Sequence, residues 1–137
     1  MIKSITINIA VKDLTRSTAF FQKVGFNVNP LFASEPEMEL IDLSDALKVM
    51  LNSEPRFSQI SRKAVADAGQ EAEVIFQLRV GSRKEVDEFV DRALGAGGRP
   101  IHEPNEGEFV YGRSFTDLDN HNWDFFWASE SDGGANS

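Results

Sequence analysis

Ile5-Thr6-Ile7-Asn8-Ile9-Ala10-Val11 is followed, 69 positions later, by a second segment of the same pattern, Val74-Ile75-Phe76-Gln77-Leu78-Arg79-Val80. In both segments every second residue is apolar. Because successive side chains of a β-strand point to opposite faces, the pattern predicts two strands, each with one apolar face that packs. The residues between the apolar positions share no type, so we expect this second face, called the cup face below, to serve a site.

The repeat continues beyond these strands. Asp13 is a typical N-cap for an apolar-periodic helix that ends at Gly25, and Ser82-Arg83-Lys84-Glu85 has the form of a capping box before a second helix. Short extended segments separated by turn residues follow each helix, so each half predicts a βαβββ module. We therefore expect an α+β fold in which two modules form one cupped mixed sheet.

The modules occupy about 1–52 and 73–128 of a single predicted domain, 1–128. We expect the linker between them, 53–72, to contain a short helix near 58–68. Aligning the last strands of the two modules matches their packing residues as follows: Leu47, Val49 and Leu51 with Trp123, Phe125 and Trp127.

Composition excludes several classes of partner. With 137 residues, 41% of them hydrophobic, the chain can bury a real core. A formal net charge of −8 argues against a nucleic-acid partner and against docking on an anionic membrane surface. No apolar run is long enough to span a membrane, and the absence of cysteine fits a reducing compartment, so we expect a cytoplasmic protein. The polar tail, 129–137, is predicted to be disordered.

Three segments carry a resemblance to a known superfamily: residues 8–14 with Ser17 and Phe20-Phe21, residues 80–98, and Gly112-Arg113-Ser114-Phe115-Thr116-Asp117-Leu118-Asp119-Asn120-His121-Asn122-Trp123-Asp124. Together they resemble the vicinal oxygen chelate superfamily, which includes glyoxalase I, extradiol dioxygenases and bleomycin-resistance proteins. The run 49–57 is similar to a bacterial lactoylglutathione-lyase-related subgroup. The resemblance spans roughly 5–127 and implies a glyoxalase-like fold.

Metal-dependent members of that superfamily place one ligand on each of four strands. The resemblance carries these positions over to Thr6, to Lys48 or Met50, to Ile75 and to Asp124. Of these, Asp124 alone is a good ligand for a divalent ion. We therefore predict no conventional metal site and no cofactor, with a divalent metal on an incomplete ligand set as the alternative.

Asp124 has two interpretations. It could act as a general base that abstracts a proton alpha to a carbonyl. It could instead be a structural carboxylate paired with Lys48 or Arg79, whose predicted faces share the cup. The two interpretations are compatible, because a base in a cup needs an orienting partner.

Further residues are candidates for contact with a ligand in the cup: Asn8, Lys48, Met50, Gln77, Arg79, Tyr111, Arg113 and Phe126. Tyr111 and Arg113 alternate with Phe109 and Phe115, so all four share one face. If that face is the cup, they offer an aromatic wall and a cation. If it faces the helices, Arg113 must reach solvent or a carboxylate.

Other motifs are weaker. Arg56 and Phe57 on the linker could close the mouth of the cup, whereas Trp123 and Trp127 are expected to pack under the helices. His102 and His121 are interpreted as loop and turn histidines, with a ligand or proton-shuttle role as the alternative. The run 117–128 lacks the glycine and glutamate of a calcium loop.

Three functions compete. The first is a metal-free protein that binds a small polar or anionic molecule in the cup, as bleomycin-resistance proteins sequester a ligand. The second is a glyoxalase-class lyase, isomerase or dioxygenase that uses Asp124 with or without a divalent metal. The third is an assembly role with a vestigial cup. The resemblance also implies a homodimer, with modules paired within or between chains.

Overall fold

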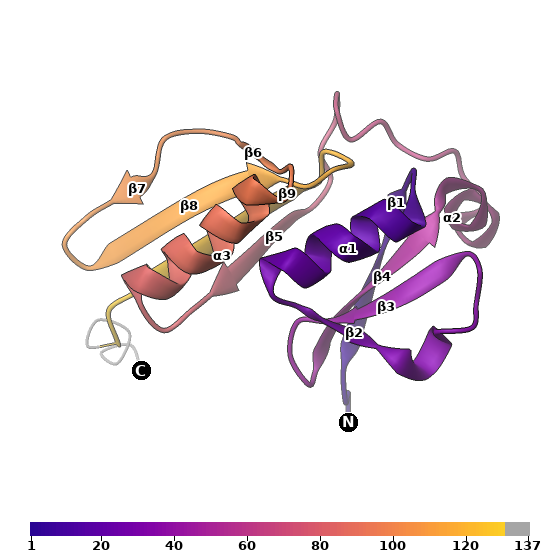
Figure 1. The fold of residues 1–137 in the computed structure, drawn as a ribbon, viewed down its shortest axis with the longest axis horizontal. Coiled ribbons are helices and arrows are strands. Elements are labelled where there is room, and N and C mark those ends of the chain that lie inside the picture. Colours follow the sequence, from indigo (N-terminus) through magenta and orange to yellow (C-terminus); the bar gives the residue numbers. More distant parts are fainter. Residues whose placement is uncertain (131–137) are drawn as a thin grey trace. The chain divides into compact units, whose positions relative to one another are not determined.

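The computed structural model describes residues 1–130, which form two compact units (Figure 1). Unit 1 is Met1–Glu71, and unit 2 begins at Ala72. Of the predicted disordered tail, residues 131–137 lie outside the described part of the chain. The first residue of that tail, Ser129, donates its backbone N–H to the carbonyl of Phe109 at 2.8 Å, so ordered structure extends past the predicted boundary.

Unit 1 contains the following elements: β1 (Ile5–Val11), α1 (Leu14–Val24), β2 (Asn27–Asn29), the 3-10 turn η1 (Pro30–Phe32), β3 (Met38–Asp42), β4 (Leu47–Ser53) and α2 (Glu54–Ser61). Its sheet has the order β1-β4-β3-β2, with β1 parallel to β4 and the other pairs antiparallel.

Unit 2 repeats this plan with β5 (Ile75–Arg79), α3 (Arg83–Gly95), β6 (Arg99–Pro100), β7 (Asn105–Glu106), β8 (Val110–Thr116) and β9 (Asn122–Ala128). Its sheet order is β5-β9-β8-β6, and β7 also pairs with β8. Again the first and last strands are parallel and the rest antiparallel. The predicted α+β fold with two mixed-sheet modules is confirmed.

Helix α1 covers one face of the sheet of unit 1, and α3 covers one face of the sheet of unit 2 (Figure 1). In each unit the core lies between the helix and the sheet that it covers. In unit 1, Phe20, Phe21 and Val24 of α1 are buried with the apolar residues of β4. In unit 2, the fully buried ring of Trp123 stacks on Phe76 with 4.3 Å between ring centroids. The predicted packing role of Trp123 is therefore confirmed, and of the alternating apolar residues in the two repeated strands, Ile9, Val11 and Phe76 are buried.

The predicted linker differs from the structure. Strand β4 runs to Ser53, and α2 follows at once, because the Ser53 hydroxyl caps the helix by accepting the backbone N–H of Arg56 at 3.2 Å. Pro55 in the first turn favours this start, since its missing N–H has no partner to lose there. The helix predicted at 58–68 thus begins four residues earlier, and the signal that was overlooked is Ser-Glu-Pro.

The register of the parallel pairs corrects the alignment of the two modules. Asn8 of β1 pairs with Met50, and Gln77 of β5, the equivalent residue 69 positions later, pairs with Asp124. Met50 is therefore the equivalent of Asp124, and Val49 that of Trp123. The predicted match of Val49 with Phe125 was wrong by two residues. Of the two alternatives for the position on β4, the structure selects Met50.

The helices of residues 1–130 are all too short or too polar to cross a lipid bilayer.

Candidate functional site

The cup face of unit 1 has an apolar centre. Leu40 pairs with Met50 and Met38 pairs with Asn52, so these side chains share the face opposite α1. Met38, Leu40 and Met50 form a buried cluster against which Phe32 packs. We call these four residues the apolar patch. Met50, predicted to contact a ligand, is part of it.

One end of the apolar patch is closed by an ion pair. Lys48 Nζ donates to Asp42 Oδ1 at 2.6 Å, and Asn29 Nδ2 contacts both oxygens of the same carboxylate at 3.3 and 3.2 Å. The hydrogen bond from Lys48 is the main cause that lowers the pKa of Asp42, and Asn29 adds to it. Lys48, a predicted ligand contact, therefore has its charge matched by Asp42.

The other end of the apolar patch is organised by Asn52, whose side chain is completely buried. Its Nδ2 donates to Asn8 Oδ1 at 3.1 Å and lies 3.3 and 3.2 Å from the carbonyl oxygens of Ile9 and Met50. Its Oδ1 accepts from Nε of Arg56 at 3.0 Å. A guanidinium group only donates, so this contact defines which side of the amide carries the oxygen.

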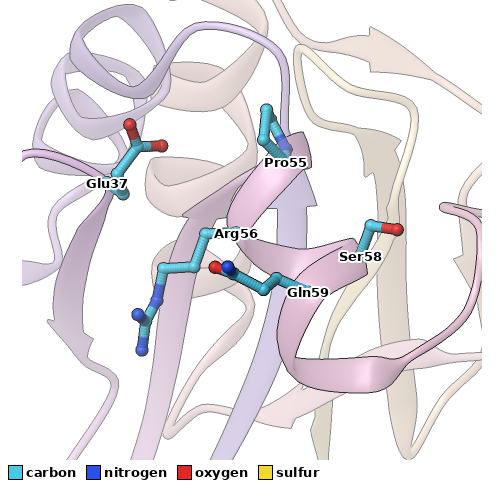
Figure 2. Close-up of a pocket in the computed structure, with 5 residues that line it drawn as sticks. All are labelled: Glu37, Pro55, Arg56, Ser58 and Gln59. Carbon is cyan, nitrogen blue, oxygen red and sulfur yellow. The ribbon is translucent and has the colours of Figure 1, made fainter.

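Arg56 lines a pocket of about 580 Å³ at the start of α2, together with Glu37, Pro55, Ser58 and Gln59 (Figure 2). Figure 2 shows its guanidinium extending away from the helix axis toward the strand that begins beside Glu37. Within residues 1–130, Arg56 makes no ion pair. Its terminal nitrogens have no hydrogen-bond partner within these residues, so they remain available as donors for an anion.

The sequence predicts only part of this site. Arg56 was predicted to close the mouth of the cup, which stays a prediction, and it lines a pocket within unit 1. Asn52 and Glu37 were missed. The available signal for Asn52 was an amide side chain at an inward position of a strand with buried neighbours, because a buried polar group requires hydrogen-bond partners.

The cup face of unit 2 carries Asp124, half-buried on β9. Gln77 Nε2 donates to Asp124 Oδ2 at 2.8 Å, while Arg79 Nη2 donates to the carbonyl of Ala128 at 3.0 Å. The predicted pairing of Asp124 with Arg79 was therefore wrong, and its pairing with Lys48, which would join the two units, stays a prediction. Gln77 is the register neighbour of Asp124 across the parallel strands, whereas Arg79 lies two residues further along and its register partner is Phe126.

Tyr111 and Arg113 lie on the helix-covered face, so the second of the two predicted alternatives holds for them. The Tyr111 hydroxyl donates to Asp87 Oδ1 at 2.6 Å, and Arg113 Nη1 donates to Asp87 at 2.8 Å and to Asp91 at 2.9 Å. Both carboxylates belong to α3. The prediction that Tyr111 and Arg113 contact a ligand in the cup is corrected: they join β8 to its covering helix.

This cluster shifts the pKa values of Asp87, Tyr111 and Arg113. The hydrogen bond from Tyr111 is the largest cause that lowers the pKa of Asp87, and Arg113 adds to it against the opposing effect of burial. The pKa of Tyr111 is raised, first by burial and then by its bond to Asp87. Arg113 thus finds the carboxylates that its position on this face requires.

The two histidines lie in loops. His102 places Nε2 3.3 Å from Ser114 Oγ and Nδ1 3.0 Å from the carbonyl of Glu103. The backbone N–H of His121 donates to the buried carboxylate of Asp117, which also accepts from the indole Nε1 of Trp123, each at 3.0 Å. Burial raises the pKa of Asp117. This carboxylate therefore organises the turn before β9.

The residues at the four positions that hold a metal in metal-dependent members of the resembled superfamily do not fit a divalent metal ion. At the four equivalent positions stand Thr6, Met50, Ile75 and Asp124. Ile75 has no donor atom, and the Met50 thioether is a ligand for soft metals that is buried in the apolar patch. Within the described residues, no group of three or more His, Asp or Glu side chains is placed to hold a metal ion.

Comparison with known proteins identifies the family. Residues 3–125 match the model of the Glyoxalase/Bleomycin resistance protein/Dioxygenase superfamily, so the chain belongs to this superfamily, and the resemblance inferred from the sequence is confirmed. No curated protein matches the chain.

Solved structures agree with this family. A hypothetical protein from S. aureus, SA1046, is 30% identical, with a TM-score of 0.80 over 93% of this chain and 95% of that one. A glyoxalase/bleomycin resistance protein/dioxygenase family enzyme from Burkholderia phytofirmans PsJN is 19% identical, with a TM-score of 0.74 and coverages of 90% and 96%. The fosfomycin resistance protein FosX from Listeria monocytogenes is 21% identical, with a TM-score of 0.64 and coverages of 96% and 98%. At 19% and 21% identity, the last two structures show a similarity of fold alone.

Proposed function

We propose that this chain binds a small polar or anionic molecule with an apolar body, and that it does so without a catalytic metal. The observation that carries the proposal is the setting of Arg56. Its guanidinium is bound through Nε to a fully buried amide, and the residue lines a pocket of about 580 Å³.

The contact with Asn52 favours binding because it orients the cation before a ligand arrives. A free arginine side chain loses rotamer freedom when it binds, and a side chain already held in place loses less. The planar guanidinium presents paired donors that match the oxygens of a carboxylate or phosphonate. Arg56 is therefore the residue expected to hold the anionic group.

Phe32, the partly buried residue of the apolar patch, is the member of the patch that an apolar portion of the ligand could reach. Met50 lies two residues before Asn52 on the same strand face, which is about 7 Å along a β-strand. A ligand whose anion meets Arg56 could extend an apolar portion toward the patch. A variant of FosX is described as complexed with Mn(II) and 1S,2S-dihydroxypropylphosphonic acid, which supports a small anion as a ligand type for this fold.

The experiment compares Arg56→Met with Arg62→Met, a loss of the same charge just past the end of the same helix. Binding of propylphosphonate and hexanoate is measured by calorimetry, and the purified chain is examined by native mass spectrometry for a retained molecule. We expect Arg56→Met to raise the Kd at least tenfold and Arg62→Met to leave it unchanged. Equal binding by wild type and Arg56→Met would refute the proposal.

A second candidate function is enzymatic, as a glyoxalase-class lyase or isomerase or a dioxygenase. The observation in its favour is that Gln77 holds one oxygen of Asp124 at 2.8 Å, an arrangement that orients a general base. Hemithioacetal turnover by the wild-type chain, lost in Asp124→Asn and retained in Gln77→Glu only at a reduced rate, would support it. Absence of turnover, with and without added nickel or zinc, would exclude the lyase.

We further propose a cytoplasmic homodimer. Ile5, Leu47 and Ile75 are exposed apolar residues, and Ile5 and Ile75 lie on the edge strands β1 and β5, which is the type of surface that pairs with a second chain. Light scattering coupled to gel filtration tests the dimer, and cell fractionation tests the location. A mass of one chain at micromolar concentration would contradict the dimer.

A further inference from the structure

The pocket at the start of α2 contains two opposite charges that do not neutralise each other. Glu37 and Arg56 both line it, yet within residues 1–130 no nitrogen of Arg56 lies within 4.0 Å of a carboxylate oxygen of Glu37. Figure 2 shows the carboxylate and the guanidinium directed away from one another. Two unpaired charges of opposite sign in one pocket indicate a ligand that carries both.

In each charged group, one polar atom is held by a hydrogen bond within the chain and the others are not. Glu37 Oε1 accepts from the hydroxyl of Ser53, whose backbone N–H also donates to the Glu37 carbonyl at 2.9 Å. On the other side of the pocket, Asn52 holds Nε of Arg56. Within the described chain, Glu37 Oε2 and the terminal nitrogens of Arg56 have no hydrogen-bond partner, so an acceptor and a set of donors remain for a ligand.

The remaining lining residues add little charge selectivity. Ser58 donates its hydroxyl to the carbonyl of Lys63 at 2.8 Å, so its proton is already used. Gln59 is exposed and carries a neutral amide that can donate or accept, and Pro55 is apolar. Among the lining residues, Glu37 and Arg56 alone can therefore distinguish ligands by their charge.

We infer that this pocket recognises a zwitterion, a small molecule with an ammonium group for Glu37 and a carboxylate or phosphonate for Arg56. Amino acids, ω-amino acids and aminophosphonates have this chemistry. The inference rests on the proposed function, in which Arg56 holds the anion, and adds Glu37 as the residue that selects a cationic group on the same ligand.

Screening by solvent limits how much more tightly the pocket can bind a zwitterion than the matching anion. Glu37 is exposed, and an exposed ion pair contributes at most about a fivefold change in Kd. The interaction of Arg56 is stronger, because a charge-assisted bidentate contact to an oriented guanidinium exceeds a single exposed ion pair. A zwitterion should thus bind about fivefold more tightly than the matching anion.

Four probes of equal chain length test this: norleucine and 6-aminohexanoate as zwitterions, hexanoate as the anion and hexylamine as the cation. Binding to the full chain is measured by calorimetry for wild type, Glu37→Gln and the control Glu35→Gln, a neighbouring exposed carboxylate that does not line the pocket. Glutamine still accepts a hydrogen bond from Ser53, and far-UV circular dichroism verifies that each variant folds.

We expect wild type to prefer at least one zwitterion over hexanoate about fivefold. Glu37→Gln should abolish this preference, and Glu35→Gln should retain it. Equal affinity for zwitterions and hexanoate, persistence of the preference in Glu37→Gln, or binding of none of the four probes would overturn the inference. If Arg56→Met leaves all binding intact, the proposed function itself fails, which is a separate outcome.

Discussion

The Nε of Arg56 donates to Oδ1 of Asn52 at 3.0 Å, so the direction of a surface cation depends on an amide with no exposed area. The same amide connects three polar groups on β1 and β4 through its nitrogen. Positioning of the proposed anion-binding group and stability of the sheet therefore depend on the same side chain.

Replacing Asn52 by alanine should weaken both the positioning of Arg56 and the stability of the sheet. The variant leaves buried carbonyl oxygens without their donor, and we expect a loss of about 2–3 kcal/mol in the free energy of unfolding. Both tryptophans belong to unit 2, so unfolding of unit 1 in urea is followed by far-UV circular dichroism. The control is Asn8→Ala, which removes one partly exposed bond and should cost less than about 1 kcal/mol. Equal costs would contradict the central role of Asn52.

The contact between Tyr111 and Asp87 predicts a dependence of unit 2 on acid. Because the folded pKa of Asp87 is lowered, its contribution to stability is present above the unfolded pKa, about 3.9, and is lost as the pH falls through the folded value. Tyr111→Phe removes the largest cause of the shift. We expect its acid unfolding, followed by tryptophan fluorescence, to move to higher pH. The exposed Asp91→Asn should move it less, and an unchanged midpoint in Tyr111→Phe would refute the assignment.

The contribution of Asp117 to stability should change with pH in the opposite direction to that of Asp87. Burial raises its folded pKa, so its contribution is present at low pH and declines as the pH rises through that value. Asp117→Ala leaves the indole N–H of Trp123 unpaired and should cost about 2–4 kcal/mol. Asp117→Asn keeps an acceptor oxygen and should cost less, with a deficit from wild type that shrinks between pH 4 and pH 7. Urea unfolding at both pH values checks this, and a growing deficit would contradict it.

Two glycines at the end of α3 provide a matched steric test. A Cβ at residue 98 would lie 3.0 Å from the carbonyl oxygens of Ala93 and Thr116, which are backbone atoms that cannot move aside. Gly98→Ala should therefore cost about 1–3 kcal/mol. A Cβ at residue 95 meets nothing within 4 Å, so Gly95→Ala should stabilise unit 2 by about 0.5–1 kcal/mol. Thermal unfolding distinguishes the two, and similar effects would contradict the geometry.

Local patterns were sufficient for the elements of the fold. Period-2 alternation placed β1 and β5, and the predicted N-caps Asp13 and Ser82 do accept the backbone N–H groups of Arg16 and Glu85. These features depend on residues within a few positions of one another. The start of α2 is the exception, and there too the local signal was present in Ser-Glu-Pro but was assigned to a linker.

The candidate site could not be predicted in the same way. Whether Asp124 meets Gln77 or Arg79 depends on the register between β5 and β9, two strands more than forty residues apart. A two-residue slip between modules was enough to leave the choice between Lys48 and Met50 open. Alternation places Tyr111 and Arg113 on one face but does not say which face, because either could be covered by a helix.

The sequence by itself thus determined the family, the α+β class and the paired modules, because helix caps, turn residues and alternation act over short distances and are written in neighbouring residues. The tertiary structure alone decided which distant polar groups meet: Asn8 with Asn52, Gln77 with Asp124, and Asp87 with Tyr111. Each of these contacts joins two elements, and its geometry depends on how strands pair and helices pack across the unit.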